Sequence, residues 1–158
     1  MKKLLVSVVV MALMMLVIAP AYATSDDNIM CGVGFGLDSL NAKVIILDHL
    51  GVELQGSAVP GVLVGTIRGI YRLNPAWRVI FYSGMGVGKG RFTVVNDEGD
   101  KISGSTDSKN FFGGIELKFT KKIFLNIDYG KVFLNLSGVG DEKKTEEKIL
   151  NFGLFFFF

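Results

Sequence analysis

The chain ends in Lys148-Ile-Leu-Asn-Phe-Gly-Leu-Phe-Phe-Phe-Phe158, and this stretch decides the fold. An exposed apolar end of this kind promotes aggregation in a water-soluble protein. Read with a period of two, one face is wholly apolar: Leu150, Phe152, Leu154, Phe156 and Phe158. The other face is mixed: Ile149, Asn151, Gly153, Phe155 and Phe157. A membrane-crossing β-strand needs this difference, because one face contacts lipid and the other lines a barrel interior.

The first 23 residues have the three parts of a secretory signal peptide. Lys2 and Lys3 form a positive start, residues 4–18 are apolar apart from Ser7, and Ala21-Tyr22-Ala23 is a small-x-small cleavage site. We predict that residues 1–23 are removed and that residues 24–158 are the exported protein. An uncleaved membrane anchor is the alternative.

The composition excludes several classes of function. Without Lys2 and Lys3 the formal net charge falls from +2 to 0, so nothing in the charge favours nucleic-acid binding. The single cysteine, Cys31, excludes an internal disulfide framework. After the signal peptide, no apolar run reaches the ~18 residues of a membrane-spanning helix. We expect neither a cofactor nor a metal.

Alternating segments run through most of the mature chain and predict six strands, at residues 29–37, 62–73, 77–93, 111–119, 123–129 and 149–158. Beyond Gly130 the alternation slips, and Val132, Leu134 and Leu136 become the apolar set. A β-bulge near Gly130 explains this change of face.

Residues 39–59 do not alternate clearly. They predict either two short strands or a helix from Ser39 to Leu50 followed by a short extended piece. A barrel in lipid cannot leave an open edge, and bacterial single-chain barrels have even strand numbers from eight upward. The sequence therefore predicts an all-β fold: a transmembrane antiparallel up-and-down β-barrel of eight strands in residues 24–158.

The connections between the strands differ in length. Asn74-Pro-Ala and Thr120-Lys-Lys are short, whereas residues 96–109 and 137–147 are long and polar. Short periplasmic turns and long external loops are typical of outer-membrane barrels. We expect the two long segments to be external loops that are able to meet an extracellular ligand.

The residues Asn151, Gly153, Phe156 and Phe158 resemble the C-terminal assembly signal of bacterial outer-membrane β-barrels. The chain as a whole resembles the small eight-stranded barrels of the OmpA-like and OmpX-like kind. The resemblance implies a bacterial outer-membrane location, insertion by the outer-membrane assembly machinery, and outer-membrane lipids as neighbours.

The strand pattern predicts a polar network inside the barrel. Its members are Arg68, Arg72, Arg78, Glu116, Lys118, Asn126, Asp128 and Asn151. An unpaired charge in a narrow interior costs several kcal/mol, so these charges should pair and plug the lumen. The alternative is a porin-like selectivity ring for solute passage. Three further aromatic residues are expected at the membrane interfaces: Tyr71, Trp77 and Tyr129.

Catalysis has little support in the sequence. His49 is the only histidine, with Asp48, Glu53, Ser57 and Ser83 as conceivable partners for lipid A hydrolysis. The glycine-rich stretch at residues 84–91 keeps strand alternation and precedes no helix, which argues against a phosphate-binding loop. We expect a non-enzymatic structural or surface-interaction protein, with a narrow channel or small-solute binder as the alternative.

Overall fold

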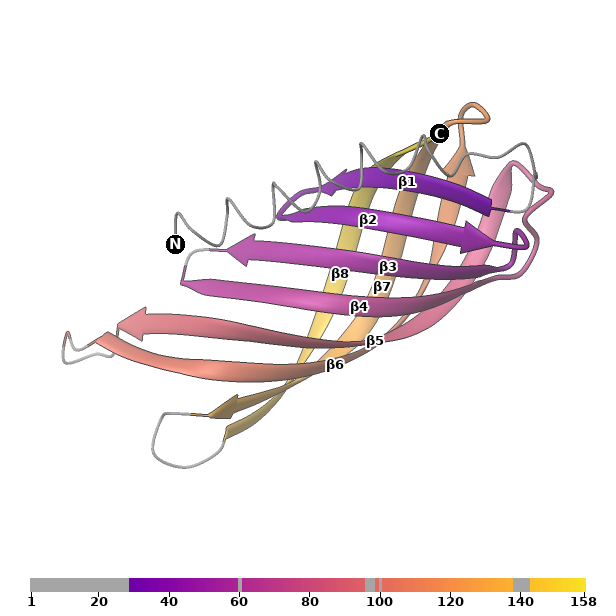
Figure 1. Cartoon of the computed structure of the whole chain (residues 1–158). Coiled ribbons are helices and arrows are strands. Elements are labelled where there is room, and N and C mark those ends of the chain that lie inside the picture. The colour runs from indigo at the N-terminus through magenta and orange to yellow at the C-terminus, as the bar shows by residue number, and fades with distance from the viewer. Residues whose placement is uncertain (1–28, 60, 96–98, 100, 138–142) are drawn as a thin grey trace.

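The computed structural model describes residues 29–59, 61–95, 99, 101–137 and 143–158. The predicted signal peptide at residues 1–23 lies outside the described residues. Eight antiparallel strands each pair with the next, and the last pairs with the first to close a barrel (Figure 1). The predicted eight-stranded all-β architecture is confirmed.

The strands are, in chain order, β1 (Ile29–Gly36), β2 (Ser39–Ile46), β3 (Leu50–Val59), β4 (Val62–Arg72), β5 (Val79–Val95), β6 (Lys101–Lys118), β7 (Ile123–Ser137) and β8 (Lys143–Phe157). The ambiguous residues 39–59 thus form two strands, and the alternative of a helix from Ser39 is wrong. Two strands are needed there because β1 and β4 would otherwise each lack a hydrogen-bonded neighbour. No helix in the described part of the chain is long and apolar enough to cross a membrane.

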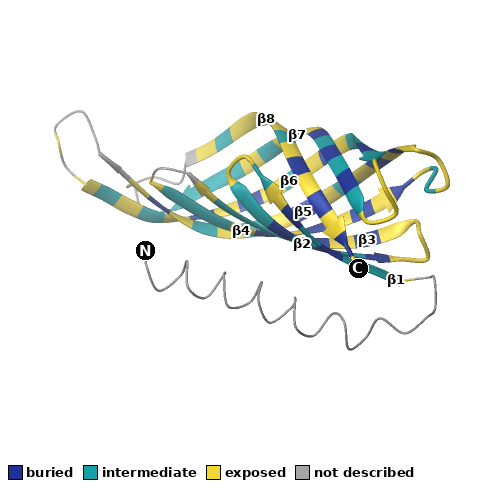
Figure 2. Cartoon of the chain, turned by 90° about the horizontal axis from the view of Figure 1, so that it is seen from above, coloured by how far each residue is buried: buried dark blue, intermediate teal, exposed yellow. Residues whose placement is uncertain are grey.

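Buried and exposed residues alternate along the strands, as Figure 2 shows by colour. In β8, Gly153, Phe155 and Phe157 are buried. Phe152, which precedes Gly153, and Phe156, which lies between Phe155 and Phe157, are exposed. The two faces predicted for the C-terminal stretch are therefore present. The exposed face is apolar, as a lipid-facing surface requires.

The β-bulge predicted near Gly130 is wrong. β7 pairs with β6 and with β8 in continuous register through Gly130. Val132 and Leu134 face the lumen like Asp128 before them, and they are apolar because this part of the lumen is itself apolar. The chemistry of the lumen changes along the strand, while the face does not.

The predicted long loops are also much shorter than expected. Residues 101–109 belong to β6 and residues 143–147 belong to β8. Polar residues are compatible with strands here because the two strands within each hairpin, β5 with β6 and β7 with β8, form hydrogen bonds between their backbones. Long strand extensions therefore replace most of the expected loops.

The strands are strongly tilted, as the register shows. Starting at Gly32 and moving from each residue to its partner on the next strand, β1 to β8, one arrives at Glu147. Where β8 pairs with β1, however, the partner of Gly32 is Phe157, ten residues further along β8. This stagger requires strands that are tilted relative to the barrel axis.

One end of the barrel holds the turns 47–49, 73–78 and 119–122 together with Phe158, and we call it the closed end. The other, where β5 and β6 extend well beyond β1 and β2 in Figure 1, we call the open end.

The outward face of β5 to β8 is mainly apolar from the closed end up to a lysine on each strand. These lysines are Lys89, Lys109, Lys131 and Lys148, and all four are exposed. Lys131 and Lys148 lie directly opposite each other. The row marks the level at which the lipid-facing surface gives way to a polar one, because charged side chains avoid the hydrocarbon and accumulate at its boundary.

Candidate functional site

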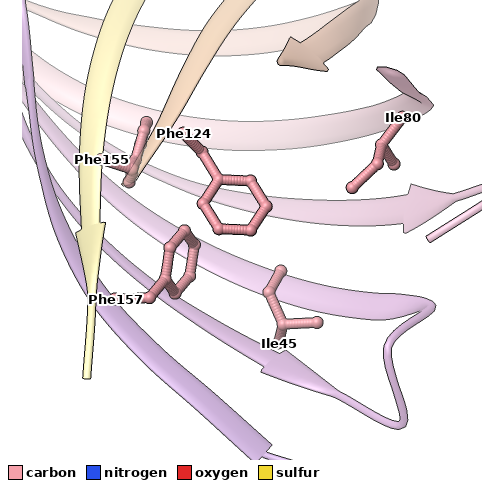
Figure 3. Packing of buried hydrophobic residues seen from close by; sticks show 5 residues of the cluster. All are labelled: Ile45, Ile80, Phe124, Phe155 and Phe157. Atoms are coloured by element: carbon pink, nitrogen blue, oxygen red, sulfur yellow. The ribbon is translucent and has the colours of Figure 1, made fainter. Parts of the chain in front are cut away.

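The closed end of the lumen is filled by an apolar cluster. Figure 3 shows Phe124, Phe155 and Phe157 beside Ile45 and Ile80 inside the barrel, and all five residues are buried. The Phe124 and Phe157 rings meet edge to face with their centroids 4.9 Å apart. Eight strands leave a bore that side chains can fill, and here aromatic rings fill it.

Glycines on β1 make room for these rings. A Cβ atom added at Gly34 would lie 2.6 Å from the Phe155 ring, and one at Gly32 would lie 2.7 Å from the Phe157 ring. β1 therefore faces the lumen without side chains where β8 fills it with phenylalanine.

Gly34→Ala is expected to lower the free energy of unfolding by about 1–3 kcal/mol, because the new methyl overpacks against a buried ring. Gly69→Ala is the matched control: its added Cβ would meet only the Met85 carbonyl oxygen, at 3.9 Å. Urea unfolding in micelles, followed by fluorescence of the single tryptophan, measures both. Equal stability of the two variants would contradict the packing argument.

Above the apolar cluster lies a buried ion-pair network. The Lys43 ammonium is 3.0 Å from both Glu53 Oε2 and Glu116 Oε1. Glu116 Oε2 is 2.8 Å from Arg72 Nε, and Asn126 donates to Glu116 Oε1 at 3.1 Å. These side chains come from five different strands, so they tie the barrel together across its bore.

The network continues towards the open end through Arg68. Its Nη1 donates to Glu53 Oε1 at 2.9 Å, and its Nη2 is 3.0 Å from Asp128 Oδ2. Asp128 also accepts hydrogen bonds from Tyr82 at 3.1 Å and from Asn151 at 2.8 Å. The Arg68 guanidinium lies over the Phe112 ring, 3.6 Å from its centroid.

The network is balanced in charge. Three cations, Lys43, Arg68 and Arg72, face three carboxylates, Glu53, Glu116 and Asp128. All six are at most 5% exposed. Charges buried at this depth are tolerated when each has an opposite charge and its hydrogen bonds. The result is a cross-linked layer with no free charge to attract an ion.

The open half of the lumen has a different character. A cavity of about 1000 Å³ lies there. Its lining is mixed. The apolar lining residues include Val64, Phe92, Val132, Leu134, Leu136 and Ile149. The polar lining residues include Gln55, Ser57, Thr66, Thr106, Ser108 and Asn110. We call this cavity the chamber. The ion-pair network forms its floor, because Asn151 both lines it and donates to Asp128.

The structure brings together six of the residues predicted for the lumen network: Arg68, Arg72, Glu116, Asn126, Asp128 and Asn151. Arg78 lies instead in the exposed turn before β5, because that strand begins at Val79. Lys118 stands at the end of β6, with its ammonium 5.7 Å from the centroid of the Phe124 ring. Neither residue contacts the network within the described part of the chain.

Sequence reasoning missed three members of the network. Lys43 and Glu53 lie in the segment without clear alternation, and Tyr82 lies within the predicted strand at residues 77–93. The sequence signal for Lys43 is the alternation of polar Asn41 and Lys43 with apolar Leu40, Ala42 and Val44. In the structure Asn41, Lys43 and Ile45 are all buried.

The four residues of the C-terminal signal divide between the two faces. Asn151 and Gly153 face the lumen, whereas Phe156 and Phe158 are exposed on the lipid side. Among the expected interface aromatics, exposed Tyr71 and Trp77 lie at the closed end. Tyr129 is exposed on β7 opposite Gly113 and Leu150, two residues before Lys131 of the lysine row.

His49 lies in the turn between β2 and β3 at the closed end. Its Nδ1 is 2.9 Å from the Arg72 carbonyl oxygen, and its ring stacks on Tyr71. Ser57 lies near the opposite end of β3 and lines the chamber. The glycine-rich residues 84–91 lie within β5, and no group of metal-ligating side chains occurs among the described residues.

Two solved structures match this chain over most of its length. The N-terminal β-barrel domain of Pseudomonas aeruginosa OprF aligns with a TM-score of 0.58 and 14% identity, over 83% of this chain and 96% of that one. Neisserial surface protein A (NspA) aligns with a TM-score of 0.57 and 13% identity, over 83% and 95%. No family model and no curated protein matches the sequence. The chain thus has the fold of a small outer-membrane barrel.

Proposed function

We propose that this chain is an outer-membrane β-barrel that does not conduct and that has a structural or surface-interaction role. The observation that carries the proposal is the filled lumen: an apolar cluster and a charge-balanced network lie one above the other across the bore. A hydrated ion has no continuous path past fully paired, buried charges.

The lipid-facing surface supports the membrane location. Exposed apolar side chains cover the outside of β5 to β8 up to the row of four lysines, and the likeness to OprF and NspA supports the same placement. With the closed end in the periplasm, the hairpins β5–β6 and β7–β8 extend outward. Their exposed charges, such as Lys89, Asp107 and Glu146, then form the surface that meets the environment.

Planar-bilayer recording tests the filled lumen. We expect no steady openings from the purified barrel, with a conducting porin in the same bilayer system as positive control. Migration on unboiled and boiled gels shows that the sample is folded, because a closed barrel shifts between the two. Reproducible unit conductance from folded protein would overturn the non-conducting role.

A second function, binding of a small apolar solute, is favoured by the chamber. Its volume lies at the upper end of the ~300–1,000 Å³ of small-molecule sites, and aliphatic side chains such as Leu134 and Leu136 contribute to its lining. The network below prevents passage, so the chamber is suited to holding a molecule rather than to conducting it.

Methyl NMR with naphthalene as probe tests this second function. We expect the Leu134, Leu136 and Val64 methyl signals to shift on titration, because these residues line the chamber. Ile45 and Ile80, sealed at the closed end, serve as controls and should not respond. An absence of shifts, or equal shifts at both ends, would exclude a site in the chamber.

A further inference from the structure

The barrel wall has a break on the side of the open end. β1 and β8 pair only from Gly32–Phe157 to Gly36–Gly153, and the chain then turns at Leu37 into β2. β8 continues for ten more residues, Lys143 to Phe152, with β7 as its only strand neighbour in the described part of the chain. An unpaired backbone edge is costly in hydrocarbon, so membrane barrels normally close along the whole bilayer.

The chamber extends into this break. Its lining includes lumen-facing residues on β3 to β8 together with Leu37, Leu150 and Phe152. Leu150 and Phe152 belong to the lipid-facing side of β8, because Asn151 between them points inward to Asp128. A cavity lined by residues from both faces of a strand passes around the edge of that strand. The chamber therefore opens sideways between β8 and the β1–β2 turn.

The sideways opening lies at the level of the hydrocarbon. Leu150 and Phe152 continue the apolar outward series of β8, and Lys148, which belongs to the lysine row, comes only two residues beyond Leu150. The rim contributed by β1 and its turn is mainly apolar: Phe35 is 56% exposed and Leu37 is 81% exposed. Asp38, the next residue of the turn, is exposed and adds one charged group to the rim. The apolar part of the rim, just below the charged row, faces lipid chains rather than water.

The chamber is amphipathic, and two polar atoms of its lining, the Thr106 hydroxyl and Asn110 Oδ1, have no hydrogen-bond partner among the described residues. Thr106 is 3% exposed, and its hydroxyl lacks a hydrogen-bond partner among the described residues. It lines the chamber on β6 together with Ser108, and Leu134 on β7 and Ile149 on β8 line the chamber between β6 and the opening. A buried hydroxyl without a partner costs free energy that a ligand hydrogen bond recovers. The ligand that matches this arrangement has a polar end and a long apolar tail.

We propose that the chamber binds a long-chain fatty acid, with its carboxyl group against the Thr106 side and its tail in the opening between β8 and the β1–β2 turn. The carboxyl group is held in its protonated, uncharged form, because the charged residues of the lining, Asp38 and Glu147, are both acidic. The fatty acid exchanges with the membrane sideways through this opening, and the ion-pair network stops it from continuing through the barrel. This inference rests on the proposed small-solute binding and adds the ligand class and its route.

Tryptophan quenching in vesicles tests the proposal on a Trp77→Phe background, which removes the natural tryptophan. Three reporters lie on β7: Leu134→Trp in the chamber, Ile127→Trp on the lipid face and Phe124→Trp in the closed end. Dibrominated stearic acid should quench Leu134→Trp and Ile127→Trp but not Phe124→Trp. Gel mobility shows that each variant is folded.

Phosphatidylcholine with brominated chains tests the route, because it stays in the bilayer. Its chains should also quench Leu134→Trp more than Phe124→Trp, and Leu37→Lys at the rim should reduce that quenching. Thr106→Val should weaken quenching by the brominated fatty acid, while leaving quenching by the bilayer lipid unchanged, since only the fatty acid brings a carboxyl group into the chamber.

The outcomes separate the two levels of the proposal. If the fatty acid quenches Leu134→Trp and the bilayer lipid quenches it no more than Phe124→Trp, the sideways route is wrong and the binding site stands. If neither quenches Leu134→Trp above the Phe124→Trp level, the fatty-acid site is wrong. Naphthalene shifts at the chamber methyls would then show that small-solute binding itself persists.

Discussion

Replacing Glu116 by alanine is expected to lower the free energy of unfolding by about 3–5 kcal/mol, the usual cost of leaving buried charges unpaired. Glu116 is fully buried and lies between the Lys43 ammonium at 3.0 Å and Arg72 Nε at 2.8 Å. Arg72 has no other ion-pair partner among the described residues, so its charge is left uncompensated inside the barrel. Urea titration in micelles, read by Trp77 fluorescence and by gel mobility, measures the loss.

The arrangement of the network also predicts an order among its variants. Lys43→Met removes one cation, but Glu53 keeps Arg68 and Glu116 keeps Arg72. We therefore expect Lys43→Met to cost less than Glu116→Ala. Glu146→Ala is the exposed control, because its ion pair with Lys131 lies in water on the outer surface, and it should not change stability measurably. Equal losses from Glu116→Ala and Glu146→Ala would show that the lumen network does not hold the barrel together.

The strands that were predictable from the sequence have contrasting faces. In β8 and in the first half of β7, apolar outward residues alternate with polar or aromatic inward ones, and the structure follows that pattern. Residues 44–46 of β2 gave no such contrast, because Ile45 points into the apolar cluster while Val44 and Ile46 point out. A period-two pattern is visible only where the two faces of a strand differ in their side chains, and at residues 44–46 both faces are aliphatic.

The same cause explains the misplaced bulge and the missed chamber. Val132, Leu134 and Leu136 were assigned to the lipid face because they are apolar, whereas they line the chamber. Pairings between strands far apart in sequence, such as Lys43 with Glu116, are beyond any local pattern. They depend on the register around the whole barrel. The sequence thus predicts the barrel and much of its charged layer, and the structure alone reveals the apolar chamber above it.

Deletion of Phe158 is expected to reduce assembly in cells to a small fraction while changing the stability of refolded protein little. In the structure Phe158 contributes one backbone hydrogen bond, from its N–H to the Cys31 carbonyl oxygen at 3.0 Å, and a ring that is 40% exposed on the lipid side. One such bond is worth about 0.5–1.5 kcal/mol net, so barrel refolded in micelles should lose no more than this. If Phe158 instead belongs to the signal that the assembly machinery recognises, its loss stops insertion before stability matters.

Phe152→Ala is the matched control, because it removes a ring from the same face of β8 away from the chain end. Heat-modifiable protein in the membrane fraction, compared with urea midpoints of refolded samples, separates the two effects, and normal insertion of the deletion variant would exclude a recognition role for the last residue.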